Sequence, residues 1–361
     1  MTTLAALLTG LAMMALPGNP ATDPADALRA EQDAFRRAVA RVAPCVVTIE
    51  TIGGTQPGRR QPTSGPAFGG REAAPPGFIV ADGPTTGLIW SADGLILTSA
   101  FNFVRDPSLI TVVLSDRRRF VGELIARDEV RRLAMVRVPA TGLPVPQWVG
   151  DEGEVRVGQR VLALGRGFGG PFCSITAGIV SGLNRMSGLA IQTDARLSPA
   201  SFGGPLIDLD GRVIGLCVPF GMGNDLLSGV EWYDSGIGFA IPAWQVRASG
   251  TDLSTGHSLR RGMLGVVLDA KGNAPPTIRL LADRSPALRA GLKAGDAIVA
   301  IDGKPVTAYS DLTRLMRSRC AGQWVKVRVR RGAQEVDLEV VLAVPEDVGS
   351  LNPPASEPAG P

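Results

Sequence analysis

The amino-acid sequence predicts a mainly β protein that folds as two globular units. With 361 residues, of which 45% are hydrophobic and only 20% charged, the chain is long and apolar enough for two domains with cores of their own. Its 45 glycines and 28 prolines lie between many short Val, Ile and Leu runs, a pattern typical of short strands joined by tight turns. The composition therefore favours an all-β barrel over a disordered chain.

The first 26 residues are predicted to be a signal peptide or an anchor. Residues 4–16 form an apolar run that ends at Pro17 and is too short for a comfortable membrane span. No Lys or Arg precedes this run, although a signal peptide ordinarily has one there. We expect an exported protein, periplasmic or secreted, that is cleaved between Ala21 and Ala27; the alternatives are an uncleaved membrane anchor and a cytoplasmic chain.

Residues 27–42 predict an amphipathic helix that ends before Pro44, because four apolar side chains recur near helical spacing among charged ones: Leu28, Phe35, Val39 and Val42. Residues 52–76 are rich in Gly, Pro, Arg and Gln and predict a mobile surface loop. The apolar runs that follow predict strands of a first barrel, at 86–90, 94–98, 109–114 and 133–138. A second barrel is expected over residues 155–242, with a variable loop at 221–233.

Several motifs resemble landmarks of the HtrA/Deg family of PDZ-containing serine proteases, in that family's order. The loop of residues 193–206 and the hairpin of 208–216 have the outline of its nucleophile loop. Further matches cover residues 46–49, 94–98, 158–165, 176–181 and 236–242. The resemblance implies a chymotrypsin-like double six-stranded β-barrel at residues 27–247, a linker at 248–259 and a PDZ domain at 260–345. The family's segment before the barrel often supports trimers, so an exposed apolar stripe on the helix of residues 27–42 would suggest an oligomer; a helix packed on its own barrel is the alternative.

Three positions decide whether this barrel cuts peptide bonds. Acyl transfer needs an activated hydroxyl, an imidazole that takes its proton and a carboxylate that orients the imidazole. The resemblance places Phe101 at the histidine, Arg132 at the aspartate and Phe202 at the serine. Ala200 stands where the family has a glycine that shapes the oxyanion hole. The alternative is an alignment slip, in which all three are ordinary packing or surface residues.

Rescue by a neighbouring group is disfavoured by composition. Ser201 offers a hydroxyl one residue earlier, but the only histidine of the chain, His257, lies beyond the barrel, and no lysine precedes Lys271. Carboxylates have an ordinary pKa near 4 and are poor bases for a serine unless burial raises it. Losing the nucleophile or the histidine alone removes on the order of 10⁶ in turnover in a related system. We therefore predict an inactive serine endopeptidase homologue; a label by similarity would read serine-type endopeptidase.

The C-terminal third resembles a PDZ domain of the bacterial, circularly permuted kind. The resemblance rests on residues 261–267 and on the run 285–305. The dipeptides Gly295-Asp296 and Asp302-Gly303 predict turns that bracket a strand at 297–301. Ser310 is predicted to cap a helix that Gly322 stops. The tail from residue 346 to 361 has too few apolar residues to pack and is predicted to be disordered.

The resemblance also implies a peptide-binding site in this domain. Backbone amides of four consecutive residues would receive a peptide's terminal carboxylate, with the peptide added as a strand beside them: Met263, Leu264, Gly265 and Val266. Three apolar residues of the helix would line its side-chain pocket: Leu312, Leu315 and Met316. The alternative is that these residues fill the core of the small domain. Arg260 and Arg261 are interpreted as solvated charges rather than as partners of the terminus.

Charge and cysteine usage predict neither a nucleic-acid partner nor a cofactor. The net charge is +3, and the densest basic runs, residues 117–119 and 131–132, are short and lack interleaved aromatics. The four cysteines have no metal-binding spacing, so no metal site is expected: Cys45, Cys173, Cys217 and Cys320. Free buried thiols are the default, with one disulfide between Cys45 and Cys217 as the alternative.

The sequence thus favours a non-catalytic HtrA-like protein, a pseudoprotease that binds peptides or unfolded exported proteins. Its role would be envelope quality control, scaffolding, or regulation of an active relative by mixing into its trimers; homo-oligomers are the other expected assembly. The alternative is an active HtrA-like serine endopeptidase. A third hypothesis is that Phe101 and Phe202 meet and give the vacated cleft another ligand.

Overall fold

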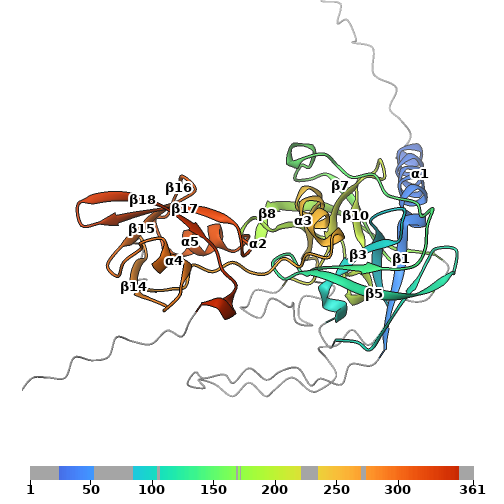
Figure 1. The fold of residues 1–361 in the computed structure, drawn as a ribbon. Coiled ribbons are helices and arrows are strands. Elements are labelled where there is room, and N and C mark those ends of the chain that lie inside the picture. Colours follow the sequence, from blue (N-terminus) through green and yellow to red (C-terminus); the bar gives the residue numbers. More distant parts are fainter. Residues whose placement is uncertain are drawn as a thin grey trace, which may run out of the picture.

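The computed structural model describes residues 24–52, 84–103, 106–167, 170, 172–220, 235–269 and 274–348. Within them the chain forms two closed six-stranded barrels and a smaller β domain, which lie side by side in Figure 1. The mainly β, chymotrypsin-like fold with a PDZ domain is confirmed. The signal segment up to residue 23, most of the loop at 52–76, the variable loop at 221–233 and the tail after residue 348 lie outside the described residues.

The first barrel is closed in the strand order β1-β2-β3-β6-β5-β4. The hairpin predicted over residues 86–98 is confirmed by β2 and β3, since Gly87 lies opposite Thr98. The sequence analysis missed β5, a strand with only one buried face. The strand bounds are β1 (Val46–Ile52), β2 (Thr85–Ile89), β3 (Leu95–Ser99), β4 (Leu109–Val113), β5 (Arg119–Asp128) and β6 (Leu133–Arg137).

The second barrel is closed in the order β10-β11-β12-β9-β8-β7. Its β8–β9 connection is α2 (Arg185–Gly188), a single turn in which Met186 and Ser187 have φ of 52° and 67°. Non-glycine residues adopt this left-handed region uncommonly. The strand bounds are β7 (Arg160–Gly165), β8 (Ser174–Asn184), β9 (Ala190–Thr193), β10 (Pro205–Ile207), β11 (Val213–Cys217) and β12 (Gly238–Pro242).

The helix predicted at residues 27–42 is α1 (Pro24–Val42), and it packs on its own barrels. Val42 is buried, Phe35 and Val39 pack against the same core, and Leu28 remains 60% exposed. Most of the apolar stripe is therefore covered by the chain itself. In Figure 1 α1 lies at the end of the barrels far from the PDZ domain.

A second helix, α3 (Ala243–Ser254), follows β12 and was not expected from the sequence. Its buried residues include Val246, Ser249 and Leu253, so residues 248–254 of the predicted linker pack on the barrels. Residues 255–259 then lead into the PDZ domain. The Leu259 N–H donates to the Arg127 carbonyl at 2.8 Å, and the Leu259 carbonyl accepts the Glu129 N–H at 2.9 Å. The linker is thus hydrogen-bonded to the C-terminal end of β5.

The PDZ domain has a sheet in the order β13-β14-β15-β17-β18, and β13 is its edge strand. The predicted strand at 297–301 is confirmed as β15. Its turn glycines, Gly295 and Gly303, have φ of 89° and 75°, which a side chain would disfavour. The bounds are β13 (Val266–Asp269), β14 (Thr277–Leu281), α4 (Pro286–Arg289), β15 (Ala297–Ile301), β16 (Lys304–Pro305), α5 (Tyr309–Met316), β17 (Trp324–Arg331) and β18 (Gln334–Val341).

The prediction that Ser310 caps the helix is wrong. Helix α5 begins at Tyr309, and Asp311 supplies the cap: its carboxylate accepts the Thr307 and Ala308 N–H groups at 3.0 and 3.2 Å. Hydrogen bonds from Thr307, Ala308 and Arg314 hold the pKa of Asp311 at about 2, well below its ordinary value. A charged carboxylate is the better acceptor at a helix N-terminus. The helix also ends at Met316, before Gly322.

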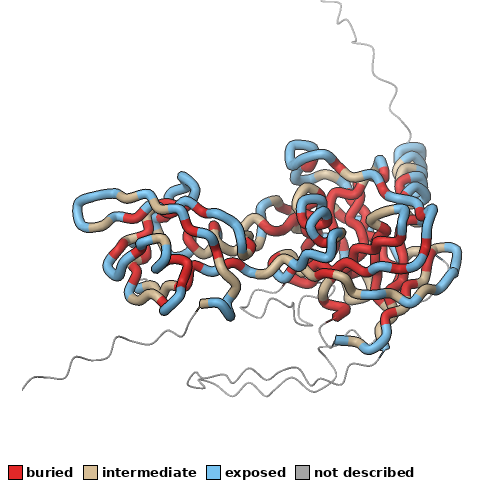
Figure 2. Tube along the Cα trace, in the orientation of Figure 1, coloured by how far each residue is buried: buried red, intermediate tan, exposed pale blue. Residues whose placement is uncertain are grey.

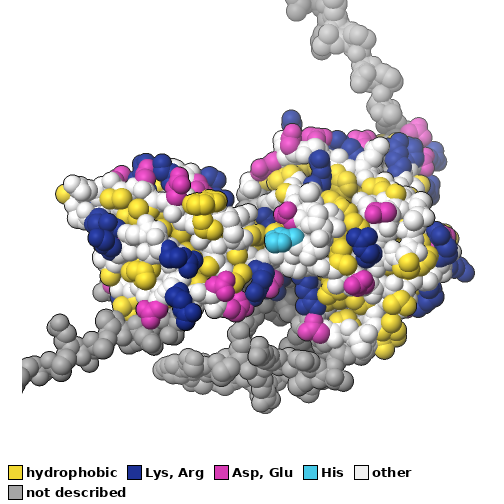
Figure 3. All heavy atoms as spheres, viewed as in Figure 1, with side chains coloured by type: hydrophobic (Ala, Val, Ile, Leu, Met, Phe, Trp, Pro, Cys, Tyr) yellow, Lys and Arg dark blue, Asp and Glu magenta, His cyan; other side chains and the backbone are white. Residues whose placement is uncertain are grey.

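Buried side chains form one core inside each barrel, one between the barrels and one in the PDZ domain (Figure 2). On the face shown in Figure 3, Lys and Arg side chains alternate with Asp and Glu side chains over both lobes. None of the described helices is both long enough and apolar enough to span a membrane.

Asp296 gives the PDZ domain a testable dependence on pH. Its carboxylate is 1% exposed and accepts two hydrogen bonds of 2.8 Å from Arg331 and one of 2.9 Å from the Lys293 N–H. The Arg331 hydrogen bond is the main reason that the pKa of Asp296 lies below its ordinary value of 3.8. Because the folded pKa is the lower one, this stabilisation is present above about pH 4 and is lost as the pH falls through the folded pKa.

We expect Asp296→Asn to lower the free energy of unfolding by about 2 kcal/mol at pH 7, since it leaves the Arg331 guanidinium without its carboxylate. The difference from the unaltered chain should shrink as the pH falls below 4. Urea denaturation at several pH values measures it. A difference that stays constant down to pH 2 would contradict the assignment.

Candidate functional site

Two aromatic rings meet where the resemblance places the catalytic pair. Phe101 belongs to a 3₁₀ helix (Ala100–Phe103) that follows β3 of the first barrel, and Phe202 follows a 3₁₀ helix (Pro199–Ser201) before β10 of the second. The ring centroids of Phe101 and Phe202 are 5.5 Å apart with an interplanar angle of 82°. The two residues are only 7% and 3% exposed. An edge-to-face pair of this kind is attractive beyond its buried area, so the rings stabilise the seam between the barrels.

Arg132 lies beside this pair through its backbone rather than its side chain. It occupies the turn between β5 and β6 with φ of 60°, and its carbonyl accepts the Ala100 N–H at 2.8 Å. Burial lowers the pKa of its guanidinium, while the charge of Glu129 raises it and that of Arg261 lowers it. Both charged neighbours lie where the barrel meets the PDZ domain. Arg132, which the resemblance places at the aspartate, is therefore part of the domain junction.

The loop before Phe202 forms a tight turn that uses its own amides. The Phe202 N–H donates to the Pro199 carbonyl at 3.2 Å, and the Ser201 N–H donates to the Ser198 carbonyl at 2.9 Å. An oxyanion hole needs N–H groups aimed at the developing negative charge, and one of them is the amide of the nucleophile's position, where the resemblance places Phe202. Here that amide is directed back into the 3₁₀ turn.

Ser201 is also engaged within the loop. Its hydroxyl donates to the Ser198 carbonyl at 2.9 Å and accepts the Ser198 N–H at 3.0 Å, so it closes a capping box. A serine nucleophile instead needs its hydroxyl hydrogen-bonded to a base. His257 is exposed in the segment between the barrels and the PDZ domain. The geometry therefore supports a structural role for Ser201.

A network of threonine hydroxyls from the first barrel holds the loop before Phe202 in place, and the sequence analysis missed it. The Thr86 hydroxyl donates to the Ala200 carbonyl at 2.6 Å, and the Thr98 hydroxyl donates to the Thr86 carbonyl at 2.7 Å. The Asn102 amide donates to the Thr98 hydroxyl at 2.8 Å. A side chain on Gly203, whose φ is 85°, would collide with the Thr86 carbonyl and the Thr98 hydroxyl. The two threonines on neighbouring buried strands were the available signal.

Among the described residues, no group of three or more His, Cys, Asp or Glu side chains is placed to hold a metal ion. All four cysteines are free, so the disulfide considered between Cys45 and Cys217 is not formed. The two thiols belong to different cores, one between the barrels and one inside the second barrel. Burial raises the pKa of Cys45 to about 11 and that of Cys217 to about 12, so both stay protonated at neutral pH.

The predicted carboxylate-binding segment leads into the edge strand β13. Neither the Leu264 nor the Gly265 amide donates to a backbone carbonyl within the described part of the chain, while the Met263 amide donates to the Ala343 carbonyl at 2.9 Å. Gly265 has φ of 74° and packs against Ser285. At most three of the four predicted amides are thus available to a peptide terminus.

The predicted pocket residues of α5 differ in their burial. Leu312 and Leu315 are 4% and 8% exposed and belong to the domain core together with Leu264, whereas Met316 is half-buried against that core. Met316 therefore has the accessible surface that a peptide side chain needs. Arg260 is paired with Glu129 and Glu346, which supports its interpretation as a charge that does not face the peptide.

The contact between Phe101 and Phe202 can be tested by a double-mutant cycle in urea denaturation. We expect Phe101→Ala and Phe202→Ala each to lower the free energy of unfolding by about 3 to 4 kcal/mol, because both rings are buried. Their coupling should be about 1 kcal/mol. Phe103, which packs in a different core, provides the control: its coupling to Phe202 should stay below about 0.5 kcal/mol. Equal coupling in both cycles would contradict a specific ring contact.

Two family models match the chain. A trypsin-like peptidase domain matches residues 85–216, and a PDZ domain matches residues 262–342. A protein of Halomonas elongata named "Probable periplasmic serine endoprotease DegP-like" is 34% identical over 301 residues, which are 77% of this chain and 61% of that protein. The chain thus spans about three fifths of the length of this DegP-like relative. A protein of Synechocystis sp. named "Putative serine protease HhoA" is 31% identical over 341 residues, 85% of this chain and 83% of that one.

Solved structures give the same relationship. The structure named "HtrA-type protease AlgW with decapeptide" has a TM-score of 0.63 and 26% identity, over 89% of this chain and 99% of that one. The serine endoprotease from Yersinia pestis has a TM-score of 0.61 and 24% identity, over 86% of this chain and 97% of that one, which shows a shared fold. From its barrels, its PDZ domain and these relatives, the chain belongs to the HtrA/Deg family of trypsin-like serine proteases.

Proposed function

We propose that this chain is a pseudoprotease of the HtrA/Deg family, which binds exposed peptide segments or C-termini through its PDZ domain and does not cut them. The contact between Phe101 and Phe202 is the observation that carries this proposal. Two hydrocarbon rings stand where proton transfer needs an imidazole and a hydroxyl. The inward-turned amide of Phe202 and the capping role of Ser201 support it further.

The proposed location is the cell envelope, as an exported protein that is periplasmic or secreted, or held by the apolar segment at residues 4–16. The DegP-like relatives carry "periplasmic" in their names, which supports export. In that compartment the protein would act in quality control, as a scaffold, or as a regulator that mixes into oligomers of an active relative. Unfolded exported proteins and their C-termini are its proposed partners.

The peptide site is proposed on the free edge of β13. A peptide added there gains backbone hydrogen bonds with the strand. Its terminal carboxylate would accept hydrogen bonds from the free Leu264 and Gly265 N–H groups. Met316 would contact its last side chain, with Leu264, Leu312 and Leu315 behind it. The related protease AlgW has been solved with a decapeptide, which gives a peptide of useful length for a test.

Cleavage of an unfolded protein tests the loss of catalysis. We expect purified chain to leave β-casein intact, because neither a base nor a serine stands at the triad positions. A variant with Phe101→His, Arg132→Asp and Phe202→Ser restores the three side chains, and adding Ala200→Gly frees the loop. Gain of cleavage by either variant would confirm the three positional assignments.

The control in this assay is a fluorophosphonate probe, which labels an activated serine and also reveals contaminating protease. Circular dichroism shows whether each variant keeps its fold. Cleavage by the unaltered chain at a rate that persists through a second purification, with no labelled contaminant, would establish the active endopeptidase and overturn the proposal.

Peptide capture tests the PDZ site. We expect the full chain to bind labelled decapeptides that end in an apolar residue with a free carboxylate. Amidation of the terminus should weaken binding by about 10-fold to 100-fold, because hydrogen bonds to a charged group are lost. Met316→Ala should weaken it by about fivefold or more, and the 50% exposed Leu288 of α4 gives the matched control Leu288→Ala, which should not. Fluorescence anisotropy measures both.

A pull-down from envelope extract complements this measurement. Captured proteins should be lost when residues 260–345 are deleted, provided that the remaining barrels still fold by circular dichroism. Partners that the truncated chain retains would place recognition in the barrels instead.

A further inference from the structure

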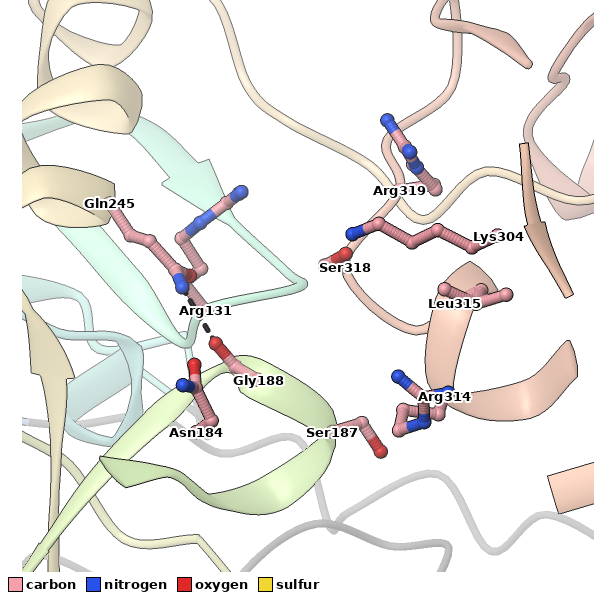
Figure 4. A pocket seen from close by; sticks show the side chains of 10 residues that line it. All are labelled: Arg131, Asn184, Ser187, Gly188, Gln245, Lys304, Arg314, Leu315, Ser318 and Arg319. Carbon is pink, nitrogen blue, oxygen red and sulfur yellow. Dashed lines mark hydrogen bonds between the residues drawn. The ribbon is translucent and has the colours of Figure 1, made fainter. Parts of the chain in front are cut away.

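A cavity of about 600 Å³ lies between the barrels and the PDZ domain and shares Leu315 of α5 with the proposed peptide pocket (Figure 4). Its barrel wall includes Arg131, from the turn between β5 and β6, and Gln245 of α3. Its PDZ wall includes Lys304 of β16 and Arg314 of α5. This volume is within the range of small-molecule sites, which is about 300 to 1,000 Å³. None of the residues from Met263 to Val266 lines it.

The lining of this cavity is strongly cationic. Four of its ten residues carry a positive charge and none carries a carboxylate: Arg131, Lys304, Arg314 and Arg319. Serine hydroxyls and side-chain amides make up most of the rest, from Ser187, Ser318, Asn184 and Gln245. In Figure 4 the Lys304 ammonium extends from the PDZ wall toward the barrel, and Ser187 lies opposite Arg314. Charge from both domains therefore converges on one space.

Nearby carboxylates neutralise this charge only in part. Arg131 pairs with Asp128 at 3.1 Å, Arg314 pairs with Asp311 at 3.4 Å, and Arg319 pairs with Asp302. Lys304 has no ion pair or side-chain hydrogen bond to any residue that the structure describes. The Nε–H groups of Arg131 and Arg319 likewise have no hydrogen-bond partner among the described residues, so neither guanidinium is saturated by its carboxylate.

This arrangement selects a class of ligand. Guanidinium groups present planar, paired donors that match phosphate oxygens, and an ammonium adds a point charge. Hydroxyl and amide groups among the cations suit a ligand that carries further oxygen atoms. The Gln245 NH₂ group donates to the Gly188 carbonyl at 2.7 Å, which fixes this side chain on the barrel wall of the cavity.

We propose that the cavity between the barrels and the PDZ domain is a binding site for a small phosphorylated ligand, such as a diphosphate or a sugar phosphate. Such a ligand contacts Arg131 and Gln245 on one side and Lys304 and Arg314 on the other. Binding therefore links the two domains and stabilises the arrangement seen in Figure 1. This inference does not depend on whether the barrel cleaves peptides.

Isothermal titration calorimetry on the full chain tests the proposal, with inorganic pyrophosphate as the probe. We expect saturable binding with one site per chain. Lys304→Gln combined with Arg314→Gln should weaken it at least tenfold. Arg279 and Lys293 are exposed on the same domain outside the cavity, so Arg279→Gln with Lys293→Gln removes the same charge and should change the affinity less than twofold.

Further experiments identify the ligand and the residues that bind it. Glucose 6-phosphate and a short-chain phosphatidic acid separate a soluble sugar phosphate from a lipid headgroup, while citrate reports a general preference for anions. Hydrogen exchange should slow in both walls, at residues 184–188 and 314–319, when pyrophosphate is present. Equal losses in the two charge variants, citrate binding as tight as pyrophosphate, or slowing confined to one domain would each overturn the proposal, as would the absence of binding at millimolar pyrophosphate.

Discussion

The rest of the candidate site depends on the edge-to-face contact between Phe101 and Phe202. The two rings come from different barrels, so their contact closes the seam at which a triad of this fold works. Buried aromatic pairs gain free energy from apolar area and from ring geometry, and neither gain needs a proton donor. Each of the two rings provides the apolar partner that the other buried ring needs. The seam is thus adapted to packing.

The backbone of the loop follows from the same adaptation. An oxyanion hole holds amides away from their own turn, which leaves them unsatisfied until a substrate arrives. In this chain the Phe202 amide pairs with the Pro199 carbonyl, and the Ser201 side chain closes the turn. Two features fix the position of the loop. The Thr86 hydroxyl donates a hydrogen bond to it, and a side chain at Gly203 would collide with the strands of the first barrel. The Phe202 amide and the Ser201 hydroxyl are therefore satisfied within the loop itself.

The sequence predicted an element correctly where a residue type at its ends has a single physical explanation. Gly295 and Gly303 need positive φ at the ends of β15, so that strand was located correctly. It failed where tertiary contacts decide. The strand β5 begins with Arg119 and buries only one face, and α3 is stabilised by packing on the barrels, so neither has a strong local pattern. At α5, Ser310 was predicted to be the cap, but the turn at Thr307 brings the Asp311 carboxylate to the Thr307 and Ala308 amides.

Membership of a family fixes the fold of this chain more firmly than its chemistry, because chemistry depends on a few side chains that a fold tolerates in many forms. Arg132 illustrates the difference. Its carbonyl accepts the Ala100 N–H beside Phe101, while the charges of Glu129 and Arg261 at the domain junction act on its guanidinium. At that junction the buried Asp128 carboxylate accepts the Val130 and Arg131 amides, and the backbone beside it pairs with Leu259 of the linker. The turn between β5 and β6 thus takes part in the junction with the PDZ domain.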